Sequence, residues 1–226
     1  MNPGELLARL GVRALQWLRG LGRSALFLAD LLGNVPAALR RVYLIVVQIH
    51  AIGNYSVLII VASGLAVGLV LGLQGYYTLS RYGSEESLGL LVTLILMREL
   101  GPVVTALLYA GRAGTSLTAE IGLMKAGEQI AAMEMMAIDP KQRVLAPRFI
   151  GGVIAMPLLA AMFSAIGIFG GYVVGVQMIG IDAGQFWSQM QDGVDVFDDV
   201  GNGIIKSVVF GFVCTFVALY QGYEAE

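Results

Sequence analysis

The stretch that decides the fold runs from residue 98 to residue 140 and begins Arg98-Glu99-Leu100-Gly101-Pro102. It passes through the glycine-rich Gly111-Arg112-Ala113-Gly114-Thr115-Ser116 and closes at Ile138-Asp139-Pro140. Long and nearly uncharged runs surround it, at residues 54–79, 149–180 and 203–220. Because charge at membrane depth is costly, ionisable residues beside a proline in such surroundings indicate a functional segment of a membrane protein.

The composition is typical of a polytopic membrane protein. Of the 226 residues, 57% are hydrophobic and 13% are charged, whereas about 25% of the residues of a soluble domain are charged. The single histidine, His50, excludes a two-histidine metal site within one chain, and the single Cys214 excludes an internal disulfide. The chain has no P-loop motif, so we expect ATP and magnesium to be bound by a partner subunit and no cofactor or metal here.

Residues 5–28 predict an amphipathic helix at the membrane surface. At about 100° per residue, one arc holds Arg9, Arg13, Gln16, Arg19 and Arg23, and leucines occupy the opposite side. Such a basic helix suits the headgroup plane of anionic lipid. A signal peptide is the alternative, but the arginines recur throughout and no small-residue cleavage site follows. A second short helix is expected from Pro36, which suits a first helical turn, to about His50.

Four apolar regions are long enough to cross a bilayer, which takes about 20 residues. We expect spans at residues 55–79, 88–117, 149–176 and 203–220. The first and third repeat glycine every four residues, a face that lets helices approach closely; these glycines are Gly64, Gly68, Gly72, Gly167, Gly171 and Gly175. Pro102 predicts a break or kink in the second span, because proline lacks a backbone donor and disfavours helix before it.

The distribution of lysine and arginine sets the orientation. Six precede the first span and five lie within residues 112–148, whereas residues 80–87 contain one and residues 149–205 contain none. The asymmetry places the N-terminus and residues 112–148 in the cytoplasm, and residues 80–87 and 179–202 on the far side. We interpret the aspartates of the latter segment as a solvated surface that faces a periplasmic partner; they are Asp182, Asp192, Asp195, Asp198 and Asp199.

Residues 119–138 predict one short amphipathic helix, which Asp139-Pro140 terminates. A charged helix on the cytoplasmic side, between two spans, suits contact with a soluble partner. A solvated connector in the headgroup region is an alternative of equal weight on the residues alone.

The ordered motifs of residues 36–223 resemble the MlaE family, the permease subunits of bacterial phospholipid-transport ABC transporters that act with MCE-domain proteins. The motifs that carry the resemblance are Arg98-Glu99-Leu100-Gly101-Pro102, Ala110-Gly111-Arg112-Ala113-Gly114, Ala119-Glu120-Ile121-Gly122, Glu128-Gln129-Ile130, Ile138-Asp139-Pro140 and Pro147-Arg148. The resemblance implies an all-α polytopic permease, a single domain over residues 1–226 with surface helices at 5–50 and a transmembrane region at 54–223. Family members continue past Gln221-Gly222-Tyr223 into one more span, whereas this chain stops at Glu226.

The resemblance also implies the biological setting. The permease would form a homodimer in the bacterial inner membrane, with a lipid cavity between the subunits. It would move phospholipid between that membrane and a periplasmic MCE-domain hexamer, which maintains outer-membrane lipid asymmetry, and it would bind no nucleic acid. A cytoplasmic ATPase subunit and a small STAS-domain subunit would be its other partners. Residues 119–139 would couple the permease to the ATPase; their charged members are Glu120, Lys125, Glu128, Glu134 and Asp139.

The candidate lipid site centres on Arg98 and Glu99. An arginine matches the geometry of a phosphate headgroup, and the alternative is that the two charges pair with each other or with a neighbouring helix. Lys206 either attracts phosphate or extends out of the end of its span. An acyl-chain pocket is expected along the far end of the first span, although ordinary packing explains the same pattern; its residues are Leu71, Gln74, Tyr77 and Leu79.

Two other classes of function remain open. An ion-coupled secondary transporter of a lipid or hydrophobic solute needs ion-coupling groups within its spans, and Glu99 is the only carboxylate deep in a predicted span. An intramembrane enzyme needs a nucleophile with a base, or a metal pair, and neither is visible in the sequence. We therefore expect a transport subunit that catalyses no reaction itself.

Overall fold

The computed structural model describes residues 3–224, and the side chains of residues 11–13 and 15–224. Every regular element in that range is helical. In chain order they are α1 (Pro3–Leu39), α2 (Val42–Ser80), η1 (Glu85–Ser87), α3 (Leu88–Ile95), η2 (Leu96–Leu100), α4 (Gly101–Tyr109), η3 (Ala110–Gly114), α5 (Thr115–Ala126), α6 (Gln129–Met135), η4 (Lys141–Leu145), α7 (Ala146–Tyr172), η5 (Val173–Met178), α8 (Ala183–Gly193), η6 (Val196–Val200) and α9 (Gly201–Glu224).

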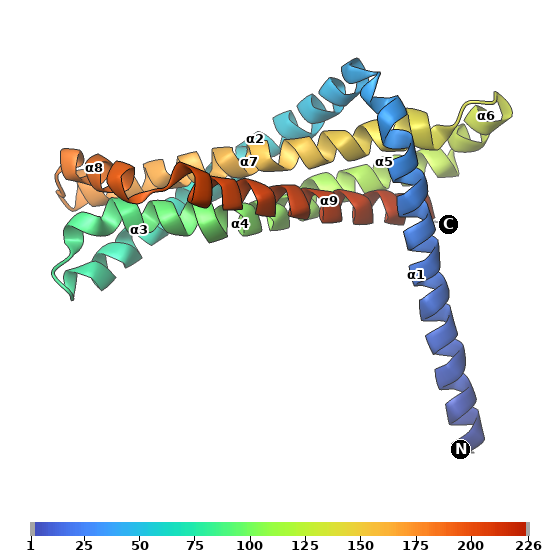
Figure 1. Ribbon diagram of the computed structural model, residues 1–226, viewed down its shortest axis with the longest axis horizontal. Coiled ribbons are helices and arrows are strands. Elements are labelled where there is room, and N and C mark those ends of the chain that lie inside the picture. The colour runs from blue at the N-terminus through green and yellow to red at the C-terminus, as the bar shows by residue number, and fades with distance from the viewer. Residues whose placement is uncertain (1–2, 225–226) are drawn as a thin grey trace.

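Four long helices form a bundle, and the fold class is as predicted. Residues 3–224 contain four helical segments long and apolar enough to cross a membrane: Val42–Ser80, Glu85–Ala126, Lys141–Met178 and Val196–Glu224. Each of the last three contains one or more π turns without losing its helical path. In Figure 1 the short helices α3 and α8 lie at one end of the bundle, and α5, α6 and the C-terminus lie at the other.

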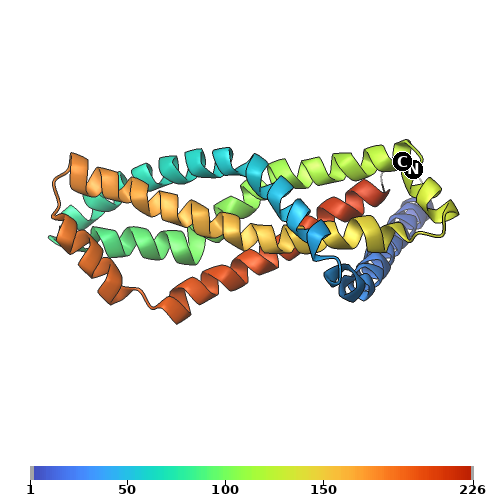
Figure 2. The same cartoon turned by 90° about the horizontal axis from the view of Figure 1, so that it is seen from above.

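The glycine faces predicted in the first and third spans pack against each other. An added Cβ at Gly68 would lie 2.0 Å from the carbonyl oxygen of Gly167, and one at Gly64 would lie 2.9 Å from that of Phe163. Only a residue without a side chain allows backbones this close. Figure 1 and Figure 2 show α2 and α7 running along the bundle together, and these glycines join the two helices.

Helix α1 runs across the bundle at the end that holds α5 and α6 (Figure 1), as a helix in the headgroup plane would. The expected division into helices at 5–28 and 36–50 is wrong, because α1 is continuous to Leu39 and Pro36 lies in its last turn. Packing explains the extension: Phe27, Leu31 and Ala38 are buried in one cluster with residues of α5, η4 and α7. After a turn at residues 40–41, the first span begins at Val42.

The break expected at Gly101-Pro102 is absent, and the second span continues through a widened turn. In η2 the Gly101 N–H bonds to the carbonyl of Leu96, five residues earlier. A π turn of this kind accommodates an irregular residue without ending the helix. It also places Arg98 and Glu99 in the widened turn itself.

The single helix expected over residues 119–138 is also wrong. Helix α5 extends the second span to Ala126, and α6 is a separate helix of seven residues. Gly127 and Glu128 form the turn between them, with Glu128 in the left-handed region at φ 55°. A left-handed residue after a helix is a common C-terminal motif, and here Glu128 adopts it although the amphipathic pattern continues beyond it.

Candidate functional site

Two ion pairs join the second and fourth spans. Arg98, on η2, binds Oδ1 of Asp199, on η6, through both Nε and Nη2. Glu99, also on η2, lies 2.7 Å through its Oε1 from Nζ of Lys206, on α9. Arg98 and Glu99 therefore pair with a neighbouring helix and not with each other, one of the arrangements that the sequence left open.

Asp199 corrects the interpretation of the aspartates as a solvated surface. Its side chain is 1% exposed, and its Oδ2 accepts a hydrogen bond of 2.9 Å from the backbone N–H of Asp195. Asp195 and Asp182 accept backbone hydrogen bonds at the starts of η6 and α8, so they serve as helix caps. Asp182, Asp192, Asp195 and Asp198 are all exposed, as expected. A buried carboxylate is tolerated when a cation and further donors satisfy it.

Lys206 has a second contact, with the backbone. Its Nζ donates a hydrogen bond of 2.8 Å to the carbonyl oxygen of Arg98. That carbonyl lies four residues before Pro102, whose ring nitrogen has no hydrogen to donate to it. Lys206 therefore fastens α9 to the irregular turn.

These charges lie within the spans. Arg98 is ten residues beyond Leu88, and Lys206 is ten residues beyond Val196, which corresponds to roughly 15 Å of helix in each case. Ionisable groups at such depth face the interior of the protein or a polar cavity and are paired. The side chain of Arg98 is nevertheless 50% exposed, so part of its guanidinium remains free for another ligand.

An apolar cavity of about 550 Å³ adjoins this charged turn. Met97 and Pro102 line it from the second span, Ser164 from α7, Trp187 from α8 and Ile204 from α9. Most of its wall is apolar, and its size is within the usual range for pockets that bind small ligands. None of the four charged side chains lines it, but their sequence neighbours Met97 and Val200 do. The arrangement suits a molecule with an apolar body and a polar end.

Known proteins of similar sequence place the chain in a family. The family model described as Permease MlaE matches residues 45–226. The chain is 53% identical, over 97% of its length and 84% of the relative, to the protein named intermembrane phospholipid transport system permease protein MlaE of Haemophilus influenzae.

The chain belongs to the MlaE permease family. It is 33% identical to a probable ABC transporter permease protein of Rickettsia typhi, over 95% of this chain and 82% of that relative. It is 27% identical to the chloroplastic protein TRIGALACTOSYLDIACYLGLYCEROL 1 of Arabidopsis thaliana, over 77% of this chain and 50% of that relative. The resemblance read from the motifs is therefore confirmed, and the chain is a multi-pass membrane permease.

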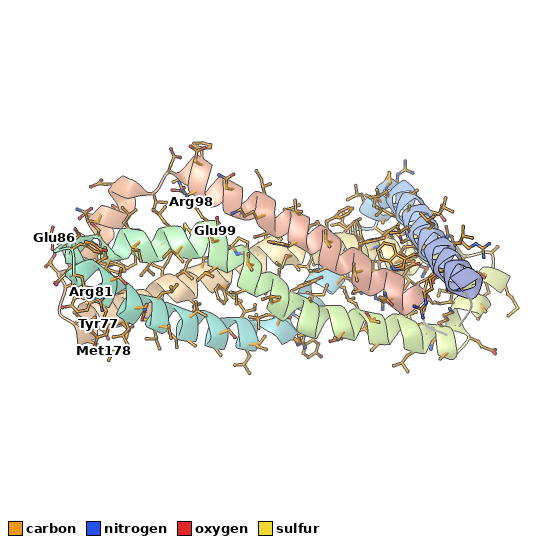
Figure 3. The ribbon with its side chains drawn as sticks, turned by 90° about the horizontal axis from the view of Figure 1, so that it is seen from below. Tyr77, Arg81, Glu86, Arg98, Glu99 and Met178 are labelled. Atoms are coloured by element: carbon orange, nitrogen blue, oxygen red, sulfur yellow. The ribbon has the colours of Figure 1, made fainter. Side chains whose placement is uncertain are left out.

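The residues expected to form the acyl-chain pocket of this MlaE-family permease lie elsewhere in the protomer. Leu71 and Leu79 are half-buried against the core, whereas Gln74 and Tyr77 are exposed, and none of the four lines the apolar cavity. Figure 3 shows Tyr77 on a different side of the bundle from Arg98. Their contact with lipid stays a prediction.

The five residues expected to couple the permease to an ATPase divide into two groups. Three have partners within the chain: Glu120 lies 3.2 Å from Arg148, Lys125 donates to the carbonyl of Tyr223, and Asp139 accepts from the backbone N–H of Lys141. The other two, Glu128 and Glu134, are exposed and form no ion pair among the side chains described.

Apolar side chains accompany these two free carboxylates. Met135 is 85% exposed, Leu123 72% and Met136 63%. They lie on α5, on α6 and directly after α6, at the end of the bundle where α6 projects (Figure 1). We call Leu123, Glu128, Glu134, Met135 and Met136 the α5–α6 tip. A surface of exposed apolar side chains with charges beside them is typical of a docking site for another protein.

The sequence did not identify Asp199 as the partner of Arg98. One signal was present: Asp199 lies four residues after Asp195, so its carboxylate can accept a hydrogen bond from the backbone N–H of Asp195 at the start of η6. The signal could not show that Arg98, 101 residues earlier, would lie opposite.

Proposed function

We propose that this chain is the membrane subunit of an ATP-driven transporter that moves phospholipid between the inner membrane and a periplasmic MCE-domain assembly. The observation that carries it is the apolar cavity beside the charged η2 turn at membrane depth, in a chain of the MlaE family. The cavity suits acyl chains, and the guanidinium of the half-exposed Arg98 side chain suits a phosphate.

The ion pairs orient the groups that meet the headgroup. Asp199 holds Arg98 through two guanidinium nitrogens, which fixes the side chain and leaves its remaining donors for phosphate oxygens. Lys206 is held by Glu99 and by the Arg98 carbonyl, so its ammonium has one donor left. A phosphate close to Arg98 would compete with these carboxylates, which lets a bound lipid loosen the link between η2 and α9.

The α5–α6 tip transmits the action of the ATPase. In this proposal a cytoplasmic ATPase subunit, itself accompanied by a STAS-domain subunit, docks on the tip of each protomer of a permease homodimer. Because α5 continues the second span, a displacement of the tip reaches η2 along one helix. ATP binding and hydrolysis in the partner would thus alternate the cavity between lipid-accepting and collapsed states.

The test is lipid transport by the complete complex in proteoliposomes. Arg98→Glu is expected to lower the ATP-dependent transfer of labelled phospholipid by at least about tenfold, because it replaces the phosphate-binding cation by an anion beside Asp199. Arg98→Lys should retain more activity, since it keeps the sign of the charge. The matched control is Arg81→Glu, an exposed arginine in the turn after α2, which should transport normally.

Two results would contradict the proposal. Normal transport by Arg98→Glu would remove Arg98 from the lipid path. Transport by the chain alone, driven by an ion gradient without any ATPase subunit, would support an ion-coupled secondary transporter instead.

A further inference from the structure

A second pocket, of about 320 Å³, lies between α2 and the helix formed by η3 and α5. Gln48 and Tyr55 line it from α2, and Arg112 and Ser116 line it from the opposite helix. It shares no lining residue with the apolar cavity and lies toward the end of the bundle that holds the α5–α6 tip. We call it the Arg112 pocket.

The guanidinium of Arg112 contacts a hydroxyl and an aromatic ring in the part of the chain that the structure describes. Its Nη1 donates to Oγ of Ser56 over 3.3 Å, and its guanidinium carbon lies 5.2 Å from the ring centroid of Tyr55. No aspartate or glutamate forms an ion pair with it among the side chains that the structure describes. Arg98, in the other π turn of the same span, has Asp199 as its counter-ion.

One carboxylate lines the pocket, and it is already satisfied. Oε2 of Glu120 lies 3.2 Å from Nη2 of Arg148, and Oε1 accepts a hydrogen bond of 3.5 Å from Ser116. Because Arg148 cancels the charge of Glu120, the pocket retains the positive charge of Arg112. The net charge favours an anion.

The position of Arg112 along the span indicates which anion. Ile121, nine residues further on, packs in the same cluster as Phe27 and Leu31 of α1. With α1 in the headgroup plane, Arg112 lies roughly 14 Å of helix deeper than Ile121, inside the inner leaflet. A cation at this depth needs a counter-ion, and a phospholipid drawn from the headgroup plane into the pocket would bring a phosphate to it.

We infer that the Arg112 pocket binds the phosphate of a phospholipid from the inner leaflet, as a second lipid site on the cytoplasmic side of the apolar cavity. The planar guanidinium can bind two phosphate oxygens at once, and the side-chain amide of Gln48 provides further donors from the pocket wall. Arg98 and Arg112 of the second span are 14 residues apart, or roughly 21 Å. The inner site and the apolar cavity are therefore two separate binding sites for the same phospholipid. This inference rests on the proposed function in phospholipid transport.

The experiment uses the complete complex in vesicles of phosphatidylethanolamine and phosphatidylglycerol labelled with ³²P in the phosphate. A benzophenone amino acid at Ser116 reports lipid in the pocket by forming a labelled adduct. Arg112→Gln is expected to lower the adduct by about tenfold, and Arg112→Lys is expected to retain most of it. The matched control is Arg143→Gln, an exposed arginine of η4 outside the pocket, which should leave the adduct unchanged.

Assembly is checked by copurification of the ATPase subunit. If Arg112→Gln fails to assemble, Gln48→Glu replaces it, because a carboxylate in the pocket wall should repel phosphate and lower the adduct as much. An adduct of equal yield in these variants and the parent would overturn the inference. Loss of the adduct on adding excess inorganic phosphate would support recognition of the phosphate group, since the ³²P label shows that the displaced molecule is a lipid.

Transport by the parent complex distinguishes failure of the inner lipid site from failure of the proposed function. If the parent complex transports phospholipid but the yield of the Ser116 adduct does not depend on Arg112, only the inner site is contradicted. A parent complex that forms the Arg112-dependent adduct but transports no phospholipid contradicts the proposed function and leaves the binding site intact.

Discussion

Lys206 donates a hydrogen bond of 2.8 Å to the carbonyl oxygen of Arg98, which is the carbonyl that Pro102 leaves without its regular helical donor. The same ammonium lies 2.7 Å from the Glu99 carboxylate. One side chain of the fourth span therefore satisfies both a backbone acceptor and a charge in the second span. The irregular turn persists because a residue 108 positions away supports it.

The first prediction is that Lys206 and Pro102 are energetically coupled. Lys206→Met should lower the stability of the permease by about 1–2 kcal/mol, since hydrogen bonds to charged groups are worth about 1.5–3 kcal/mol and this pair is partly exposed. In a Pro102→Ala background the penalty should shrink, because alanine restores the N–H that can bond to the Arg98 carbonyl. Thermal melting of the four proteins of this double-mutant cycle in detergent measures the coupling. Strictly additive effects would show that Lys206 does not replace the missing donor.

The second prediction concerns the buried carboxylate. Asp199→Asn should cost about 1–3 kcal/mol, because the buried group loses its ion pair with Arg98, whose side chain is half exposed. Asp192→Asn is the control, since Asp192 is exposed on the same acidic segment, and its melting temperature should match that of the parent. Equal melting temperatures for both variants would mean that the Arg98–Asp199 pair contributes nothing to stability.

The spans and the glycine faces could be predicted because their signals are local. Hydropathy over about 20 residues marks a span, and the four-residue repeat at Gly64, Gly68 and Gly72 marks a face regardless of its partner. The same repeat at Gly167 and Gly171 lets α7 pack closely against α2, a pairing that the structure shows.

Three of the errors share one cause, which is contact between residues far apart in the chain. Pro102 alone favours a break, whereas in the structure Lys206 of the fourth span binds the Arg98 carbonyl that the proline leaves without its donor. Asp199 alone is indistinguishable from Asp198, and only the position of Arg98 shows which of them is buried. Pro36 alone suggests a helix start, whereas packing of Phe27 and Leu31 keeps α1 continuous to Leu39.

The third prediction tests the close contact between the first and third spans. Gly68→Ala would place a Cβ 2.0 Å from the Gly167 carbonyl oxygen, and relief of that clash should cost about 1–3 kcal/mol. Gly53→Ala, on the same helix, has nothing within 4 Å of its added Cβ and should be neutral or slightly stabilising. The difference in melting temperature between the two alanine variants is the readout, and an equal melting temperature would refute the packing.

The fourth prediction concerns the α5–α6 tip. Reversing an exposed charge there with Glu128→Lys should weaken copurification of the ATPase subunit or uncouple ATP hydrolysis from transport, with membrane insertion unchanged. Glu86→Lys, which reverses an exposed charge on η1 at the opposite end of the bundle, should assemble and hydrolyse ATP as the parent does. Normal assembly and lipid-stimulated hydrolysis in Glu128→Lys would show that the tip is only a connector between spans.

Occupation of the apolar cavity by phospholipid is tested most directly by photocrosslinking at two positions of α9. Ile204 lines the cavity and Val213 does not, yet both side chains are 49% exposed. The crosslinker is placed at each position in the complete complex, which is purified in detergent so that only bound lipid remains, and the adducts are identified by mass spectrometry. We expect phospholipid adducts at Ile204 and a yield at Val213 lower by about tenfold. Equal yields at the two positions, or no phospholipid at Ile204, would show that the cavity does not hold the cargo.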